Sequence, residues 1–196
     1  MKAARPYDMT TRAAAAAQTA DRIVNATKKL FAEKAIADIT LADIADRAGV
    51  TVQTILRRFG DKSAVFAEAI ARVGAEVHAQ RDQAVPNDLD DLVRNLCGHY
   101  ETHGRLVLKM LGEEASTQGI GPALGRGRDY HRHWCETVFA ATLARLSGAE
   151  RNRRLAQLIA ICDVRSWEVL RIRSGLSGHQ TQTALREMLQ PLTTEV

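Results

Sequence analysis

A single stretch, ITLADIADRAGVTVQTILRRFGDK over residues 39–62, restricts the possible folds of this chain more than any other segment. It predicts two short helices joined by a tight turn. Thr40 can cap the first helix, with Asp43 three residues later as the second member of a capping box. Gly49 can adopt the left-handed backbone that ends a helix, and Thr51 can cap the next one. The stretch therefore predicts a helix-turn-helix unit.

The second of these helices is predicted over residues 52–59, and its two faces differ in chemistry. Ile55 and Phe59 are four residues apart and are expected to point toward a core. The side chains left facing outward are Val52, Gln53, Thr54, Leu56, Arg57 and Arg58. A short helix with such an outer face, held behind a tight turn, is suited to enter the major groove of DNA.

The segment from about Gln18 to about Ala69 resembles the DNA-binding domain of the TetR family of bacterial transcriptional regulators. The family pattern T-x-x-x-I-A-x-x-A-G-V-[ST] is present as Thr40, Ile44, Ala45, Ala48, Gly49, Val50 and Thr51. The closing pattern T-[IL]-Y-x-[HY]-F-x-[ST/D]-K is present as Thr54, Ile55, Leu56, Arg57, Arg58, Phe59, Gly60, Asp61 and Lys62. The departures are Ala35 where the family has Gly, Leu56 in place of Tyr, and Arg58 in place of His.

Nine residues are expected to contact DNA: Thr40, Thr51, Val52, Gln53, Thr54, Leu56, Arg57, Arg58 and Lys62. Gln53 and Arg57 share a helix face, and these side-chain types can pair with adenine and guanine respectively. Thr51 lies at a helix N-terminus, where free N–H groups bind phosphate. The resemblance implies a phosphate contact for Lys62. The alternative is that all of these are ordinary exposed residues of a small helical bundle.

The charge of the chain is concentrated in its first part. Residues 1–75 hold 12 Lys and Arg against 8 Asp and Glu, whereas residues 76–196 hold 15 of each. The net charge of +4 therefore lies with the helix-turn-helix pattern, as expected of a domain that faces phosphate. The sequence has no apolar run long enough to span a membrane. Three isolated cysteines favour a reducing compartment, so we expect a cytoplasmic protein.

The fold class is expected to be all-α, with about nine helices. Residues 1–17 are expected to form a mobile arm, either a plain terminus or a segment that reaches the minor groove. A DNA-binding domain over residues 18–64, with its motif at 40–59, is expected to precede a ligand-binding and dimerisation domain over residues 65–196. Downstream helices are predicted at about 61–83, 89–102, 105–115, 129–146, 151–173 and 181–192, with a loop or frayed helix at 116–127.

The second domain carries candidate sites that rest mainly on the family layout. A small-molecule pocket is expected to involve His99, His103, Leu106, Met110, Tyr130, Trp134 and Trp167, although such residues often form plain core. The dimer face is expected to involve Leu158, Ile161, Arg165, Leu185, Met188 and Leu189, with packing inside the chain as the alternative. His99 and His103 lack further ligands for a metal, and the sequence contains no catalytic motif. We therefore expect no metal, no cofactor and no enzyme activity.

Together these patterns predict a homodimeric transcriptional regulator that binds a palindromic operator in double-stranded DNA. It is expected to be a repressor released by a small apolar or aromatic effector. Two alternatives remain: a DNA-binding regulator controlled by a protein partner without a ligand, and an enzyme on a helical scaffold.

Overall fold

The computed structural model describes residues 9–117 and 119–194, and every regular element in these ranges is helical. The first half contains α1 (Met9–Glu33), the short 3-10 turn η1 (Ile36–Asp38), α2 (Leu41–Ala48), α3 (Val52–Phe59), α4 (Lys62–Arg81) and α5 (Leu89–Gly112). The second half contains α6 (Gly121–Val138), α7 (Ala140–Ala144), α8 (Gly148–Ile161), α9 (Val164–Trp167), the π-helical segment η2 (Glu168–Arg173) and α10 (Gly178–Thr193). The predicted all-α fold class is confirmed.

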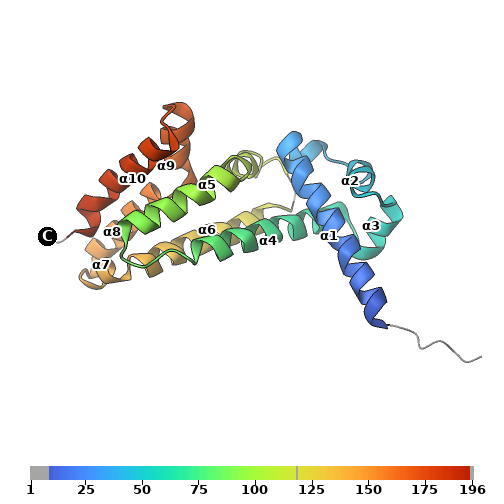
Figure 1. Ribbon diagram of the computed structural model, residues 1–196, viewed down its shortest axis with the longest axis horizontal. Coiled ribbons are helices and arrows are strands. Elements are labelled where there is room, and N and C mark those ends of the chain that lie inside the picture. The colour runs from blue at the N-terminus through green and yellow to red at the C-terminus, as the bar shows by residue number, and fades with distance from the viewer. Residues whose placement is uncertain (1–8, 118, 195–196) are drawn as a thin grey trace, which may run out of the picture.

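The molecule is elongated, with α1, α2 and α3 at one end and α8, α9 and α10 at the other (Figure 1). Helix α4 leaves the first end and runs beside α5 and α6 into the second part. Two separate groups of buried apolar residues follow this division. Because α4 is the helix that leaves one end and enters the other, it is the main structural link between the two parts.

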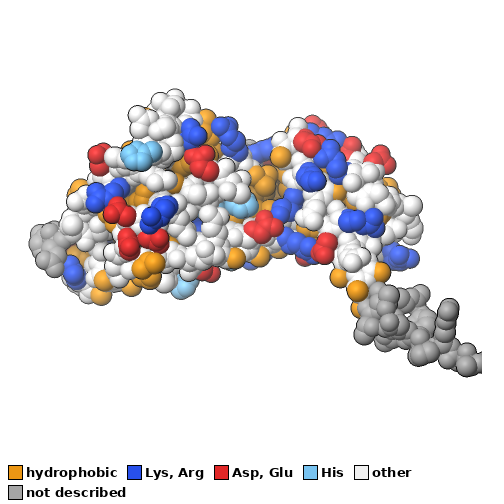
Figure 2. All heavy atoms as spheres, viewed as in Figure 1, with side chains coloured by type: hydrophobic (Ala, Val, Ile, Leu, Met, Phe, Trp, Pro, Cys, Tyr) orange, Lys and Arg blue, Asp and Glu red, His pale blue; other side chains and the backbone are white. Residues whose placement is uncertain are grey.

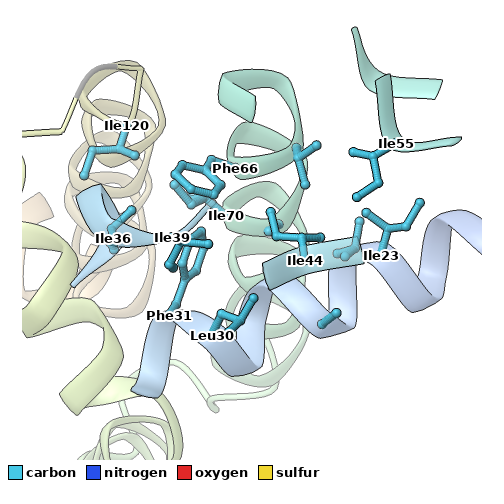
Figure 3. Close-up of a cluster of buried hydrophobic side chains, with 14 of the residues drawn as sticks. Ile23, Leu30, Phe31, Ile36, Ile39, Ile44, Ile55, Phe66, Ile70 and Ile120 are labelled. Atoms are coloured by element: carbon cyan, nitrogen blue, oxygen red, sulfur yellow. The ribbon is translucent and has the colours of Figure 1, made fainter. Parts of the chain in front are cut away.

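The core of the N-terminal end is built by α1 to α4 (Figure 3). Phe31 of α1 and Phe66 of α4 meet edge to face with ring centroids 5.2 Å apart. Ile44 of α2 and Ile55 of α3 are fully buried in the same core. Ile120, just before α6, completes this core from the other domain.

The caps of the helix-turn-helix form as the sequence predicts. Thr40 Oγ1 accepts a hydrogen bond from the Asp43 N–H at 3.1 Å, and the Thr40 N–H donates to Asp43 Oδ2 at 2.7 Å. Gly49 has a φ of 64°, the left-handed conformation that ends α2. Thr51 Oγ1 accepts from the Thr54 N–H and begins α3. These local interactions explain why the sequence defines this unit so closely.

The first helix begins earlier than predicted. The expected arm covered residues 1–17, but α1 starts at Met9, so residues 9–17 are helical. The alanines at 13–17 explain this difference because Ala has the strongest intrinsic preference for helix. Residues 1–8 of the expected arm lie outside the described residues.

Several helix boundaries in the second part also differ from the prediction. The two helices expected at 89–102 and 105–115 are one continuous α5. The segment expected as a loop at 116–127 contains the first turns of α6, which has Pro122 in its first turn, a position that tolerates proline. The helix expected at 151–173 is divided after Ile161, where Asp163 accepts the Arg165 N–H at 2.8 Å and starts α9.

The second core holds the aromatic residues of the C-terminal part. Tyr100, Trp134 and Trp167 are all buried there, with Leu185 and Leu189 of α10. The three cysteines are buried and carry free thiols. None of the helices in the described ranges is long and apolar enough to cross a membrane.

Candidate nucleic-acid interface

Helix α3 presents the face that the sequence predicted for DNA. Ile55 is fully buried, whereas Gln53, Arg57 and Arg58 are exposed. The other members of the expected set on this helix, Val52, Thr54 and Leu56, are half-buried. In the space-filling view, Lys and Arg side chains lie at several places over the end formed by α1, α2 and α3, with acidic side chains among them (Figure 2).

The two arginines of α3 differ from other arginines nearby. Arg47 is paired with Glu33 at 2.5 Å, and Arg72 is paired with Asp21 and Glu68. Neither Arg57 nor Arg58 has an ion-pair partner among the residues that the structure describes. Their charges are therefore available to an external anion such as a phosphate, or to the acceptor edge of a base.

The arginines of α3 border an open hollow between α3, α4 and the first half of α1. Its lining is formed by Ala16, Thr19, Ala20, Thr54, Arg57, Arg58, Phe59, Glu68 and Arg72. Thr19 and Arg72 were not predicted to belong to this surface. No motif marks them, and only the packing of α1 across α3 and α4 brings them there.

The remaining residues of the expected DNA set have structural roles. The Thr40 and Thr51 hydroxyls are engaged in the helix caps, and Thr51 Oγ1 also lies 3.0 Å from Thr54 Oγ1. Lys62 Nζ donates to the Ile39 carbonyl oxygen at 2.8 Å and lies 5.3 Å from the centre of the Phe66 ring. Lys62 therefore fastens the start of α4 to the segment before α2, and its ammonium group keeps further donor capacity.

The seven residues predicted to line a small-molecule pocket do not form one group. Leu106 and Met110 of α5 pack on the N-terminal core. Trp134 and Trp167 are buried in the C-terminal core, where Tyr130 is half-buried. Two further members, His99 and His103, are neighbours on α5 with ring centroids 5.6 Å apart. One open hollow of this domain lies elsewhere, between α7, α10, the loop before α5 and the start of α5.

Burial has a strong effect on the histidines of the second domain. His99 is 2% exposed, and burial lowers its pKa to about 3, with a further contribution from the positive charge of Arg81. Burial also lowers the pKa of His131, again assisted by Arg81. Both imidazoles are therefore neutral at physiological pH. No group of three or more His, Cys, Asp or Glu residues in the described ranges is arranged to hold a metal ion.

Arg81, the last residue of α4, was missed by the sequence analysis although it lies at the centre of this domain. Its side chain is buried and stacks on Trp134, with the guanidinium carbon 3.9 Å from the ring centre. Its backbone carbonyl accepts the Trp134 indole N–H at 3.0 Å. A basic residue at the end of a helix usually faces solvent, so no sequence signal distinguished it.

The residues predicted for the dimer face fall into two groups. Leu158, Leu185 and Leu189 are fully buried within the chain, so their side chains pack in its own core instead of facing a partner. Ile161 is half-buried, Arg165 is exposed and lies 3.4 Å from Glu168, and Met188 is 43% exposed.

Residues 23–69 match the family profile of the bacterial regulatory proteins of the TetR family. A transcriptional regulator from Rhodococcus sp. Rha1 superposes with a TM-score of 0.69 at 16% identity, covering 88% of this chain and 95% of that one. The repressor NalD of Pseudomonas aeruginosa superposes with a TM-score of 0.59 at 20% identity, covering 90% and 96%. At these identities the likeness concerns the fold. No curated protein sequence matches this chain.

Proposed function

We propose that this chain, whose residues 23–69 match the TetR-family profile, is a DNA-binding transcriptional regulator that acts as a dimeric repressor and is released from a palindromic operator by a small molecule. The observation that carries the proposal is the outer face of α3, which presents Gln53, Arg57 and Arg58 without acidic partners in the described part of the chain. NalD, which shares the fold, is a repressor of an efflux pump, and this supports the repressor role.

We assign the reading of bases to Gln53 and Arg57. They lie four residues apart on one face of α3, so both can reach base edges in a single groove. Gln pairs with adenine and Arg with guanine through two hydrogen bonds each. Arg58 and the N-terminus of α3 at Thr51 are assigned to phosphates, which position the helix without specifying sequence.

The proposed control passes through α4. Its 20 residues extend for about 30 Å and connect the two cores. Val65 and Phe66 at its start pack against the DNA-binding end, and Arg81 at its end lies in the second core. A ligand that binds better to a state with a different α4 position shifts the protein away from DNA. For a tenfold release, about 1.4 kcal/mol of differential affinity is sufficient.

Dimerisation completes the proposed mechanism, since two α3 helices must enter successive major grooves about 34 Å apart. We accordingly assign residues 18–64 to DNA binding and residues 65–196 to ligand binding and dimerisation. Helix α4 connects these two domains, because it starts in one core and ends in the other.

Selection from a random duplex library tests the DNA-binding part of the proposal. We expect enrichment of a palindrome, with affinity that falls steeply as salt concentration rises. Arg57→Ala and Gln53→Ala should relax preference at particular base pairs by roughly 1–3 kcal/mol. Arg94→Ala, which removes an exposed arginine of α5 far from α3, is the matched control and should leave the selected sequence unchanged. An Arg57→Ala profile identical to that of the wild type would contradict the assignment.

Release from the selected operator tests the ligand-controlled part. Fluorescence anisotropy of labelled operator DNA is followed while small apolar and aromatic compounds are added. Saturable release by one compound class supports the proposal. If the operator complex is stable to every compound but is dissociated by a protein from the native host, control by a protein partner replaces control by a ligand.

A further inference from the structure

The second core contains a buried cation that lacks an anion. Arg81 is 3% exposed, and the described part of the chain places no carboxylate within ion-pairing distance of it. Its Nη1 and Nη2 atoms each lie 3.1 Å from His131 Nδ1. Its Nε atom is buried without a hydrogen-bond partner. An arginine side chain is cationic in proteins, so this core holds one positive charge.

His131 cannot supply the missing negative charge. Its Nε2 atom lies 3.1 Å from the Ile159 carbonyl oxygen, which can only accept a hydrogen bond, so Nε2 carries the proton. Nδ1 is then a bare acceptor for the two Nη groups of Arg81. The ring is thus a neutral hydrogen-bond partner that holds the end of the guanidinium in place.

The nearby carboxylates are engaged elsewhere. Asp82 Oδ1 accepts the Tyr130 hydroxyl at 2.7 Å, and Asp163 Oδ1 accepts the Arg165 N–H at the start of α9. The face of the Trp134 ring stabilises the guanidinium only in part, because a cation–π contact does not neutralise the charge. A buried charge is costly unless it is paired.

Two other polar atoms of the second core lack a hydrogen-bond partner as well. His99 Nδ1 and Trp167 Nε1 are buried and have no hydrogen-bond partner. Both side chains pack on Tyr100, at centroid distances of 4.7 Å from His99 and 5.8 Å from Trp167. The core thus combines an unpaired cation, two unused polar atoms and aromatic walls, which is the composition of a ligand site rather than of a plain core.

We infer that the effector of this regulator is an organic acid with an apolar body, whose carboxylate pairs with the Nε and Nη2 edge of Arg81. That edge is the one left free by His131, and it matches a carboxylate through two parallel hydrogen bonds. A single negative charge cancels the single positive charge of the site. A phosphate dianion would leave an uncompensated negative charge in the same apolar core. The inference rests on the proposed ligand control and names the chemical class of the ligand.

The position of Arg81 connects this site to DNA binding. The residue ends α4, whose other end is held to the DNA-binding domain by Lys62 and by the packing of Phe66. An acid that binds the guanidinium and shifts its position therefore shifts α4, the helix that connects both cores.

Matched pairs of an acid and its neutral amide provide the test. Benzoate and benzamide, 4-phenylbutyrate and 4-phenylbutanamide, and octanoate and octanamide are titrated into the full-length protein without DNA. The dissociation constant is obtained from tryptophan fluorescence, and the melting temperature is measured in parallel. We expect at least one acid to bind at least tenfold more tightly than its amide. If no acid in the panel exceeds its amide, the inference is overturned.

Substitution of Arg81 separates a ligand contact from a structural role. Arg81→Met should abolish the preference for acid over amide and should melt no lower than the wild type without ligand, because a buried unpaired charge is removed. Arg81→Lys keeps a cationic side chain but loses the two parallel N–H donors of the guanidinium. It should retain a weakened preference for the acid. Arg132→Met, which removes an exposed arginine of α6, should behave as the wild type. An acid preference that survives in Arg81→Met overturns the inference.

The operator assay distinguishes this inference from the proposed function. If amides release the DNA as well as acids do, control by a ligand is retained and the acidic effector is rejected. If acids bind through Arg81 but never release the DNA, the acidic site is retained and ligand control is rejected.

Discussion

At the scale of single residues, Lys62 and Arg58 are two cations of the same surface with different structural roles. Lys62 donates to the Ile39 carbonyl oxygen, whereas Arg58 has no hydrogen-bond partner in the described ranges. We expect Lys62→Met to lower the free energy of unfolding by about 1.5 kcal/mol, because a charged hydrogen bond inside the domain is lost. Arg58→Met should change it by less than about 0.5 kcal/mol. Urea denaturation measures both, and equal effects of the two substitutions would contradict the anchoring role of Lys62.

A second prediction at this scale concerns acid sensitivity. The pKa of His99 is about 3 in the folded protein, because burial disfavours the charged imidazole, whereas its ordinary value is 6.5. Between these two values the unfolded chain binds more protons than the folded one, so stability falls as pH decreases from 6.5 toward 3. The free energy of unfolding should fall by up to about 1.4 kcal/mol for each pH unit in that window because of His99. Urea midpoints at pH 7, 5.5 and 4.5 measure it, and His99→Asn should have a flatter profile than the wild type.

At the scale of secondary-structure elements, Gly104 lies inside the continuous α5, between the two helices expected at 89–102 and 105–115, and is in close contact with Trp167. A Cβ at Gly104 would lie 2.7 Å from Cζ3 of Trp167, whereas a Cβ at Gly74 in α4 meets nothing within 4 Å. Gly104→Ala should destabilise the protein by about 1–3 kcal/mol through overpacking. Gly74→Ala, the matched helix-interior control, should stabilise it by about 0.5–1 kcal/mol. Thermal unfolding compares the two, and a stabilised Gly104→Ala would show that the ring moves aside freely.

The elements also show where sequence reasoning is reliable. The bounds of α3 were predicted correctly because its caps, Thr51 and the turn at Gly49, are set by neighbouring residues. The length of α5 was not predicted. Gly104 leaves space for the ring of Trp167, and Trp167 is distant in the sequence. The burial of Arg81 depends likewise on His131 and Trp134 of α6. The α3 surface was therefore accessible from sequence, whereas the interior of the second domain required the fold.

At the scale of the whole molecule, the proposed dimer must use residues that the single chain leaves exposed. Leu185 and Leu189 are fully buried in the C-terminal core, so placing a charge there would unfold the protein and give no information on assembly. Met188, on the same helix α10, is 43% exposed. It is one of the three exposed large apolar side chains in the described ranges, together with Val85 and Val169.

We predict that the wild type is a dimer at micromolar concentration and that Met188→Glu gives a folded monomer. A charge in an apolar interface is costly, whereas an exposed position tolerates it in the monomer. Val85→Glu places the same charge on an exposed apolar residue outside α10, in the loop before α5, and should remain dimeric. Light scattering gives the mass of each variant, and helical circular dichroism confirms that each is folded.

Because the proposed operator requires two α3 helices held together, Met188→Glu should also weaken operator binding while Val85→Glu should not. A wild type that is monomeric, or a Met188→Glu variant that stays dimeric, would exclude this face of α10 from the assembly.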